Sequence, residues 1–361
     1  MTDVPGAGPV RDEDAFDVPA ATEWLRENAS DASGLDGDPE VRQFAGGASN
    51  LTYLLRWPTR DVVLRRPPGG TKAKGAHDMR REHDLQAGLA TAFPLVPRML
   101  GYCGDESVVG SEFYVMDRIP GTILRKDVPE SLGLDTDGVR TLCENAVDVL
   151  VALHDVDVDA AGLRPLDRGD GYVERQVGGW AGRMRRAHTP DVPDHEATMA
   201  WLEAHRPADR PHVLIHNDFR FDNLVLDPAD PTRVVGVLDW ELATVGDPLM
   251  DLGSSLAYWV QADDDPSFVA LRLQPTHTPG MLTRDELVAR YCAARGVEVT
   301  PRDLLFYEVF GLFRLAGIAQ QIYYRFHHGQ TTNPAYGAFR DVVAHLDQRC
   351  TRLLAERGAD L

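Results

Sequence analysis

Three polar residues near the middle of the chain have the types and the spacing that phosphoryl transfer requires. Asp218 and Asn223 lie five positions apart, and Asp239 follows Asp218 by 21 positions, directly after an apolar run. A phosphoryl group in transfer carries spread negative charge, so catalysis consists mostly of positioning and charge neutralisation. Mg²⁺ prefers hard oxygen ligands, which suits the carboxylate of Asp239 and the amide oxygen of Asn223. Asp218 is then the expected catalytic residue, because it can accept or orient the proton of an attacking hydroxyl group.

Short strands on either side are expected to position these residues. Residues 211–215 form an apolar run that enters the loop, 224–226 leave it as a strand, and 234–238 form a second buried strand after a turn rich in Asp and Pro. His216 is interpreted as a scaffold residue that hydrogen-bonds the loop backbone, and Asp222 as a solvated carboxylate. An Asp and an Asn five positions apart also fit ordinary turn chemistry, but the flanking strands and Asp239 favour a catalytic site.

The chain resembles the aminoglycoside phosphotransferase and choline kinase family, which is related to the protein kinases. The resemblance is carried by HNDFRFDN at 216–223 and GVLDWELATVGDPLMDLG at 236–253, and it runs from about Val41 to about Phe339. Arg65 and the stretch RQVGGW at 175–180 are similar to the branch found fused to, or beside, acyl-CoA dehydrogenases.

This resemblance implies an α+β, two-lobed, protein-kinase-like fold that uses ATP and Mg²⁺. The expected parts are an N-terminal extension with one helix (1–40), a nucleotide-binding lobe with a five-stranded antiparallel sheet and a helix (41–118), and a mainly α-helical lobe (119–361) that carries the catalytic loop, the metal loop and the acceptor pocket. Residues 1–15, which are rich in Pro, Gly and Asp, are expected to be mobile.

Eight residues of the first lobe are expected to bind the nucleotide. Four belong to a small-residue turn between two strands, whose backbone N–H groups can approach phosphates. Two belong to a hinge that offers its backbone to the adenine ring, and two form an ion pair. The eight residues are Gly46, Gly47, Ser49, Asn50, Arg65, Glu82, Met116 and Arg118.

Arg65 departs from the kinase pattern, since it stands where kinases have a phosphate-binding lysine. Arginine can serve there because it is always charged and can bind phosphate through two N–H groups. Glu82, on a helix expected at 77–90, is the expected partner of Arg65, with Asp78 and Asp84 as competing choices. Arg66 points to the opposite face of its strand and is expected to be solvated.

A helix is expected to begin after Asp247, which is a good N-cap, with Pro248 in the first helical position. In the family that the chain resembles, the second Asp of this motif, here Asp251, braces the catalytic loop. Another helix, expected at 171–187, carries several arginines and only one glutamate. It is either a solvated helix face or a surface that holds an anionic part of a substrate, such as the phosphates of coenzyme A.

The composition limits the class of protein. The net charge is −19, with 56 acidic against 37 basic residues, which argues against nonspecific binding to nucleic acid. No apolar run reaches the length of a membrane-spanning helix, and the first ten residues lack the features of a signal peptide. We therefore expect a cytoplasmic monomer or homodimer whose partner is a small-molecule hydroxyl acceptor, with no nucleic acid and no membrane.

Three functions stay open at this point. The first is a kinase that phosphorylates a hydroxyl group of a small molecule, either a hydroxyacyl-CoA-like compound or an aminoglycoside. The second is a nucleotide-binding pseudokinase that acts as an interaction module, which the replacement at Arg65 keeps open. The third is a metal phosphohydrolase built on the dipeptides His83-Asp84 and His154-Asp155, although no matching set of further ligands is evident.

Overall fold

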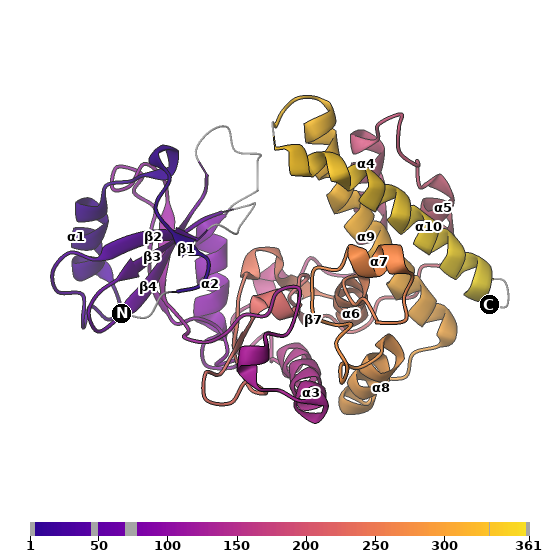
Figure 1. The fold of residues 1–361 in the computed structure, drawn as a ribbon, viewed down its shortest axis with the longest axis horizontal. Helices are drawn as coiled ribbons and strands as arrows, with labels where there is room; N and C mark the ends of the chain where they lie inside the picture. Colours follow the sequence, from indigo (N-terminus) through magenta and orange to yellow (C-terminus); the bar gives the residue numbers. More distant parts are fainter. Residues whose placement is uncertain (1–3, 45–49, 69–77, 332, 359–361) are drawn as a thin grey trace. The chain divides into compact units, whose positions relative to one another are not determined.

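The computed structural model describes residues 4–44, 50–68, 78–331 and 333–358. The chain divides into two compact units (Figure 1): unit 1 consists of residues 1–120 and 236–241, and unit 2 of residues 121–235 and 242–361. The boundary expected from the sequence lies after residue 118, with 236–241 in the second lobe. Three expected nucleotide-binding residues, Gly46, Gly47 and Ser49, lie outside the described residues.

Unit 1 is built on an antiparallel sheet of six strands in the order β1-β2-β3-β4-β6-β5. The five expected strands are all present, and β1 adds a sixth from the segment that was expected to be mobile. The strands are β1 (Ala7–Gly8), β2 (Glu40–Phe44), β3 (Leu51–Arg56), β4 (Asp61–Arg66), β5 (Met99–Cys103) and β6 (Phe113–Asp117).

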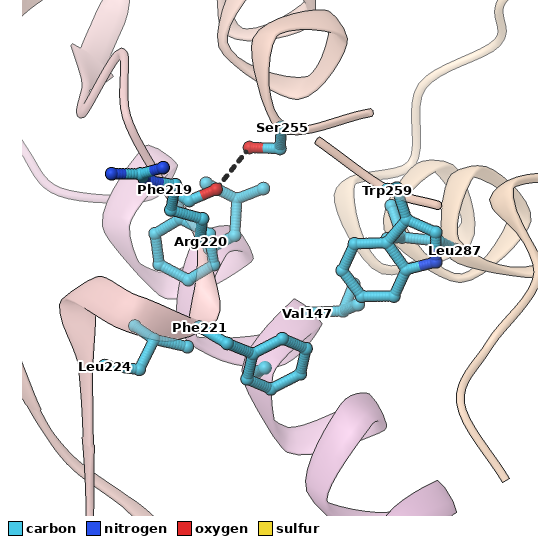
Figure 2. A pocket seen from close by; sticks show the side chains of 10 residues that line it. Val147, Phe219, Arg220, Phe221, Leu224, Ser255, Trp259 and Leu287 are labelled. Carbon is cyan, nitrogen blue, oxygen red and sulfur yellow. Dashed lines mark hydrogen bonds between the residues drawn. The ribbon is translucent and has the colours of Figure 1, made fainter. Parts of the chain in front are cut away.

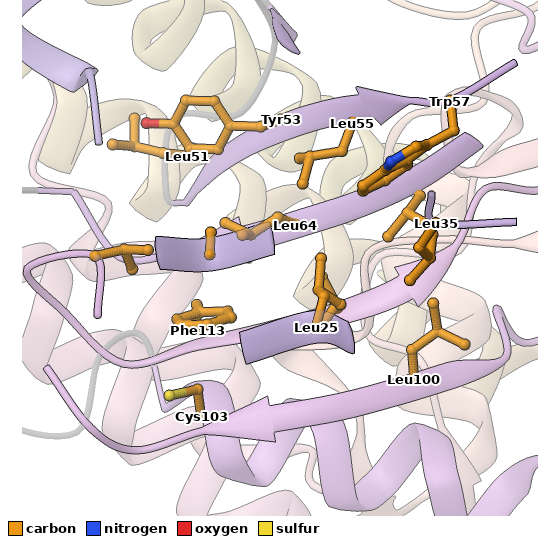
Figure 3. Packing of buried hydrophobic residues seen from close by; sticks show 14 residues of the cluster. Leu25, Leu35, Leu51, Tyr53, Leu55, Trp57, Leu64, Leu100, Cys103 and Phe113 are labelled. Atoms are coloured by element: carbon orange, nitrogen blue, oxygen red, sulfur yellow. The ribbon is translucent and has the colours of Figure 1, made fainter. Parts of the chain in front are cut away.

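One face of the sheet carries the larger hydrophobic core of unit 1 (Figure 3). Tyr53 and Leu55 alternate along β3, because successive strand residues point to opposite faces. Helix α1 (Val18–Asn28) covers this core with Leu25. The Asp17 side chain caps the helix by accepting the Ala20 N–H at 2.9 Å.

The other face of the sheet packs against helix α2 (Met79–Leu89). Met79 is fully buried there in a cluster with Val63, Tyr114 and Met116. Asp78 begins the helix, since its side chain accepts the Arg81 N–H at 2.9 Å. The helix thus presents its inner face, including Glu82, to the middle strands of the sheet.

Unit 2 is mainly helical. It contains α3 (Thr136–His154), α4 (Tyr172–Ala187), α5 (Glu196–Ala204), α6 (Pro248–Ala257), α7 (Pro266–Ala270), α8 (Arg284–Arg295), α9 (Pro301–His327) and α10 (Phe339–Arg357). Its short strands are β7 (Val213–Ile215), β8 (Leu224–Leu226), β9 (Val234–Val237) and β10 (Thr244–Gly246). Strand β7 pairs with β10 and β8 pairs with β9, and the chain passes from unit 2 to unit 1 within β9.

Helix α6 is fixed at its start and along its length. Asp247 is its N-cap, as expected, and accepts the Leu249 N–H at 2.7 Å. Gly253 of α6 and Gly311 of α9 leave no room for a Cβ atom, because a Cβ at Gly311 would collide with the Gly253 carbonyl. This close packing holds in place the turn of α6 that carries Asp251. Within the described residues, none of the helices combines the length and the apolar character that a membrane span requires.

Candidate active site

The loop between β7 and β8 carries the expected catalytic residue Asp218. Asn217, just before it, has a left-handed backbone with φ of 63°, which is uncommon for a residue other than glycine. The His216 ring accepts the Asp218 N–H through Nδ1 at 3.3 Å, so His216 does hydrogen-bond the loop backbone. The backbone conformation therefore turns sharply at the position that orients Asp218.

Asp251 of α6 is fully buried and holds this loop. Its Oδ2 accepts the His216 N–H and its Oδ1 accepts the Asn217 N–H, both at 2.7 Å. His154 Nε2 lies 3.1 Å from the same carboxylate, and His154 Nδ1 lies 2.6 Å from the Tyr291 hydroxyl. Burial by itself raises the pKa of Asp251, but the hydrogen bonds and the charges of the histidines hold that pKa below its ordinary value. The loop thus rests on an ionised, buried carboxylate.

Asp218 and Asn223 meet directly. The Asn223 amide nitrogen donates to the Asp218 backbone carbonyl at 2.8 Å and to the Asp218 carboxylate at 3.0 Å. Because both bonds use the amide nitrogen, the amide oxygen of Asn223 is the atom left to bind a cation. This arrangement suits the donor set that Mg²⁺ prefers.

Arg220 lies beside the Asp218 carboxylate, and the sequence analysis did not single it out. Its Nε is 3.3 Å from Asp218 Oδ2 and 3.0 Å from Asp222 Oδ1, and its guanidinium lies over the Tyr258 ring at 4.8 Å. The prediction that Asp222 is solvated was wrong, since its side chain is only 13 % exposed and burial raises its pKa. Arg220 therefore places a positive charge between two loop carboxylates.

Mostly apolar side chains surround the pocket next to the catalytic loop (Figure 2). The Phe219 carbonyl accepts the Ser255 hydroxyl at 2.8 Å, and the Phe221 N–H donates to the Gln274 side chain at 2.7 Å. A cavity of about 20 Å³ remains there, lined by Phe219, Phe221, Trp259 and neighbouring apolar side chains. It is about the size of one water molecule.

In unit 1, Arg65 lies among three carboxylates and is 8 % exposed. Its guanidinium nitrogens are 3.1 Å from Asp239 Oδ1, 3.6 Å from Glu82 Oε2 and 3.9 Å from Glu241 Oε2. Burial lowers the pKa of Arg65, but its negatively charged neighbours raise it above the ordinary value. Arg65 is therefore a permanent cation at this site.

Glu82 is fixed from two further sides. The Tyr114 hydroxyl donates to Glu82 Oε2 at 3.0 Å and the Asn50 amide donates to Glu82 Oε1 at 3.1 Å. Burial raises the pKa of Glu82, and the charge of Arg65 opposes that rise. The Asn50 amide also donates to Glu241 at 3.3 Å. Asn50 thus links the two glutamates of the cluster.

Asp239 follows β9 with a left-handed backbone, φ 66°, and its side chain is 36 % exposed. A non-glycine residue in this conformation is held there by its surroundings. The next residue, Trp240, supplies that support, because it is fully buried and its Nε1 donates to the Val237 carbonyl at 2.9 Å. The carboxylate of Asp239 is therefore held in place while staying partly accessible.

The competing partners of Arg65 have other roles. Asp78 caps α2, and Asp84 lies 2.9 Å from the ring of its neighbour His83. The expectation that Arg66 is solvated was wrong: it is 8 % exposed and donates to the Tyr53 hydroxyl at 3.0 Å.

The two hinge residues lie at the end of β6. Met116 pairs with Val63 in the sheet. The Arg118 N–H donates to the Asp61 carbonyl at 3.2 Å. Burial lowers the pKa of Arg118 although Asp61 lies nearby. The Arg118 N–H is therefore already engaged within unit 1.

Several residues of the site escaped the sequence analysis. Glu241 gave the clearest signal, since it is a carboxylate two positions after Asp239. His154 was noticed only as part of a His-Asp dipeptide, because its partner Asp251 is 97 positions away. Tyr114 gave no signal, because a strand tyrosine is usually a packing residue.

A cluster of arginines lies beside the catalytic loop in unit 2, around Trp180 of α4. The Arg183 and Arg314 guanidinium groups lie over the Trp180 ring at 4.5 and 5.4 Å, and Arg314 donates to the Asn217 carbonyl at 2.9 Å. Burial, and then the charges of Arg186 and Arg314, lower the pKa of Arg183. Of the basic residues on α4, Arg185 pairs with Glu196 at 2.7 Å, but among the described residues Arg183 and Arg186 have no acidic partner. We call Arg183, Arg186 and Arg314 the arginine cluster.

The histidines of the two His-Asp dipeptides have separate partners. His83 contacts Asp84, and His154 contacts Asp251 and Tyr291. No group of three or more His, Cys, Asp or Glu side chains within the described residues could hold a metal ion by itself.

Comparison with known proteins places the chain in a family. The model of the phosphotransferase enzyme family matches residues 40–302, and the chain belongs to this family. The fold is that of its protein-kinase-like members. A putative aminoglycoside phosphotransferase from Ralstonia eutropha has a TM-score of 0.79 and 29 % identity over 95 % of this chain and 99 % of that one. Choline kinase from Cryptosporidium parvum has a TM-score of 0.64 and 11 % identity, over 95 % and 97 % of the two chains.

A further fold neighbour is an aminoglycoside phosphotransferase solved as a ternary complex with ADP and hygromycin B. It has a TM-score of 0.54 and 13 % identity, over 93 % of this chain and 98 % of that one. These likenesses confirm the predicted two-part α+β fold.

Curated relatives in animals carry other names. Acyl-CoA dehydrogenase family member 10 of Mus musculus is 36 % identical over 91 % of this chain and 30 % of its own length. Acyl-CoA dehydrogenase family member 11 of Gallus gallus is 34 % identical over 99 % of this chain and 45 % of its own length. The chain thus spans less than half the length of these relatives, as the expected resemblance to a fused branch implies.

Proposed function

We propose that this protein transfers the γ-phosphoryl group of ATP to a hydroxyl group of a small molecule, with Mg²⁺ as the metal. The observation that carries the proposal is the pairing of Asp218 with Asn223 on a loop that buried Asp251 holds. Neighbouring folds solved with ADP, or with GDP and kanamycin, support a nucleotide as the phosphoryl donor.

Asn223 and Asp239 are the proposed metal ligands. Both hydrogen bonds of Asn223 to Asp218 use its amide nitrogen, so its amide oxygen can bind a metal ion. The Asp239 carboxylate is partly accessible. Both oxygen ligands fit a hard cation. When bound, Mg²⁺ would neutralise charge on the phosphate oxygens.

The remaining roles follow from the charges of the side chains. Asp218 would accept a hydrogen bond from the acceptor hydroxyl and orient it for attack. Arg220 would hold the Asp218 carboxylate and offset part of its charge. In unit 1, Arg65 would bind phosphate oxygens, while Glu82 would keep the guanidinium in position.

Between the two acceptors that the sequence left open, the arginine cluster favours the anionic one. Arg183 and Arg186 have no acidic partner among the described residues, and Arg314 ties the cluster to the loop through the Asn217 carbonyl. Such a surface attracts phosphates or carboxylates and repels polycationic aminoglycosides. We therefore propose a hydroxyacyl-CoA-like acceptor, which also agrees with the names of the curated relatives.

A nucleotide-binding pseudokinase stays a second candidate because of one contact. Arg65 is 3.1 Å from Asp239, the proposed metal ligand. If that ion pair persisted with nucleotide present, the positive charge of Arg65 would oppose the binding of Mg²⁺ at Asp239.

One experiment separates these functions. ADP release from Mg-ATP would be measured with hydroxyacyl-CoAs, free hydroxy acids, aminoglycosides and choline as acceptors. We expect turnover with hydroxyacyl-CoAs. Turnover with aminoglycosides alone would contradict the proposed acceptor, and nucleotide binding without turnover on any acceptor would favour the pseudokinase.

A further inference from the structure

A second cavity, lined by polar side chains, lies in unit 2 between α7 and α10. Its volume is about 260 Å³, and it is lined by Asp265, Ser267, His345, Gln348, Arg349 and Arg352. One water molecule needs only about 10–15 Å³ of such space, so the cavity has room for a larger ligand. None of these six residues belongs to the catalytic loop or to the arginine cluster, so the proposed function leaves the cavity unexplained.

The basic residues of the cavity share one face of α10. His345, Arg349 and Arg352 are spaced at i, i+4 and i+7 in this helix, which places them on neighbouring turns of the same side. Phe268 of α7 fixes two of them: the Arg349 guanidinium lies 4.0 Å from the centre of its ring, and the His345 ring stacks on it at 5.5 Å. The site is therefore preorganised rather than a chance meeting of mobile surface chains.

Two buried nitrogen atoms of this site lack a partner among the described residues: Arg349 Nε and His345 Nε2. Arg349 is 8 % exposed, and its other side faces Asp264, 3.1 Å away. Buried guanidinium and imidazole nitrogens usually have a partner. An oxyanion in the cavity would supply an acceptor for the Arg349 N–H donors.

The charges around the cavity favour an anion. Asp264 is shared by two arginines, Arg349 and Arg284, the latter at 2.6 Å, so it neutralises only one of them. Asp265 is engaged with the first turn of α7, where it accepts the Ser267 N–H at 2.9 Å as well as the Ser267 hydroxyl. Arg352 is exposed and has no ion pair among the described residues. Three guanidinium groups thus face two carboxylates, and the excess charge is positive.

The hydrogen bonds of Ser267 and His345 indicate which kind of anion fits the cavity. Because the Ser267 hydroxyl donates to Asp265, its oxygen is left to accept from His345 Nδ1, 3.3 Å away. Burial lowers the pKa of His345, with Arg349 and Arg352 adding to the effect although Asp265 opposes it. A neutral His345 with its proton on Nδ1 offers Nε2 as an acceptor. The site therefore combines guanidinium donors with one acceptor, which matches an oxyanion that retains a proton.

We propose that the cavity between α7 and α10 is a binding site for a phosphate group, held by Arg349 and Arg352 with His345 contacting its protonated oxygen. The group belongs either to free inorganic phosphate or to a phosphate monoester. The site is separate from the proposed catalytic residues and does not depend on the proposed function.

The test is calorimetric titration of the full chain with inorganic phosphate in the presence of saturating Mg-ADP, so that the proposed nucleotide site is already filled. Arg352→Glu is the main variant, because this exposed side chain is not needed for packing. Arg340→Glu is its matched control, since it is an exposed arginine on the same helix outside the cavity. We expect Arg352→Glu to weaken phosphate binding by about tenfold or more, with Arg340→Glu unchanged.

A second variant and a second probe sharpen the result. His345→Phe keeps the stacked ring but removes the acceptor, so it should reduce the preference for phosphate over sulfate, which carries no proton at neutral pH. Tighter binding of glycerol 3-phosphate than of phosphate would identify a monoester as the ligand, and the reverse would identify the free ion. Absence of phosphate binding to the wild type, or equal binding to Arg352→Glu and Arg340→Glu, would overturn the proposal.

Discussion

The Arg65 cluster of unit 1 and the catalytic loop of unit 2 hold their carboxylates in different ways. Around Arg65, the side chains of Asp239, Glu82 and Glu241 share one guanidinium, and neutral donors from Asn50 and Tyr114 add to the contacts of the glutamates. In the loop, Asp218 is placed by backbone hydrogen bonds that end on buried Asp251. Side-chain ion pairs can exchange partners when a charged ligand arrives, whereas a backbone held by a buried carboxylate cannot move without breaking several hydrogen bonds. We therefore expect the ion pairs around Arg65 in unit 1 to rearrange when a charged ligand binds, and the loop that carries Asp218 in unit 2 to keep its geometry.

The largest effect is expected from removing the carboxylate under the loop. Asp251→Ala leaves two backbone N–H groups and His154 without their acceptor, and the loss of one partner of such a buried pair costs about 3–5 kcal/mol. We expect urea unfolding to show this loss, together with loss of phosphotransferase activity. Asp285→Ala, an exposed carboxylate in the first turn of α8, is the control and should change stability by about 0.5 kcal/mol or less. Equal effects of the two substitutions would refute the role of Asp251.

The same residue gives a pH dependence. The folded-state pKa of Asp251 is lowered from 3.8, so its charge contributes stability that is present above pH 3.8 and is lost as the pH falls through the lower folded-state value. The stability difference between wild type and Asp251→Asn should therefore shrink below about pH 4. If the stability difference between wild type and Asp251→Asn grew as the pH fell, the pKa of Asp251 would not be lowered in the folded state.

The next effect concerns the metal. Asp239→Ala should abolish the dependence of ATP binding on Mg²⁺, because it removes the only proposed carboxylate ligand. Glu241→Gln should weaken Mg²⁺ binding by a few-fold only, since Glu241 is held by Asn50 at the edge of the cluster. Titration of nucleotide binding against Mg²⁺ measures both. An unchanged titration in Asp239→Ala would count against its role as a ligand.

Substitution of Arg65 tests whether the unit 1 cluster adapts. Arg65→Met removes the guanidinium that is proposed to bind phosphate oxygens, and it leaves buried Glu82 without its cation. We therefore expect Mg-ADP to bind about 10–100-fold more weakly. Arg65→Lys keeps the charge and should recover part of the affinity. If Arg65→Met bound Mg-ADP as the wild type does, Arg65 would be a structural residue and the pseudokinase would gain weight.

A smaller effect than that of Arg65→Met is expected at the arginine cluster. Arg183→Ala should raise the KM for an anionic acceptor by about tenfold and leave kcat nearly unchanged, because the charge acts in binding rather than in the transfer step. Arg185→Ala, two positions away and paired with Glu196, is the matched control. The same increase in KM for both variants would show that only general charge matters.

The sequence predicted the parts of the fold and site that depend on short spacing. The helix after Asp247 begins where the Asp-Pro pair indicates, and Asp218 and Asn223 meet as their five-residue spacing suggests. The strands of unit 1 could be predicted because the alternation of apolar and polar side chains is a local pattern. Local patterns were thus sufficient for these elements and for the Asp218–Asn223 pair, although they missed the burial of Asp222 beside Arg220 on the same loop.

Partners that are far apart in the sequence could not be predicted. Asn50 contacts Glu241 across 191 positions, and no local pattern connects them. Arg66 was misjudged for the same reason: its strand face is covered by the N-terminal segment, where Arg66 donates to the Asp14 carbonyl at 2.7 Å. The position of that segment, including β1, depends on the whole sheet rather than on its own Pro- and Gly-rich sequence.

In the proposed reaction Asp218, on a fixed loop, orients the acceptor hydroxyl, whereas other residues bind the nucleotide. The most direct test is to compare wild type and Asp218→Ala for turnover with the best acceptor and for binding of Mg-ATP by the same protein samples. We predict that turnover falls by about 10²–10⁴-fold and that the Kd for Mg-ATP stays within about twofold. An Asp218→Ala enzyme with full turnover would contradict the account.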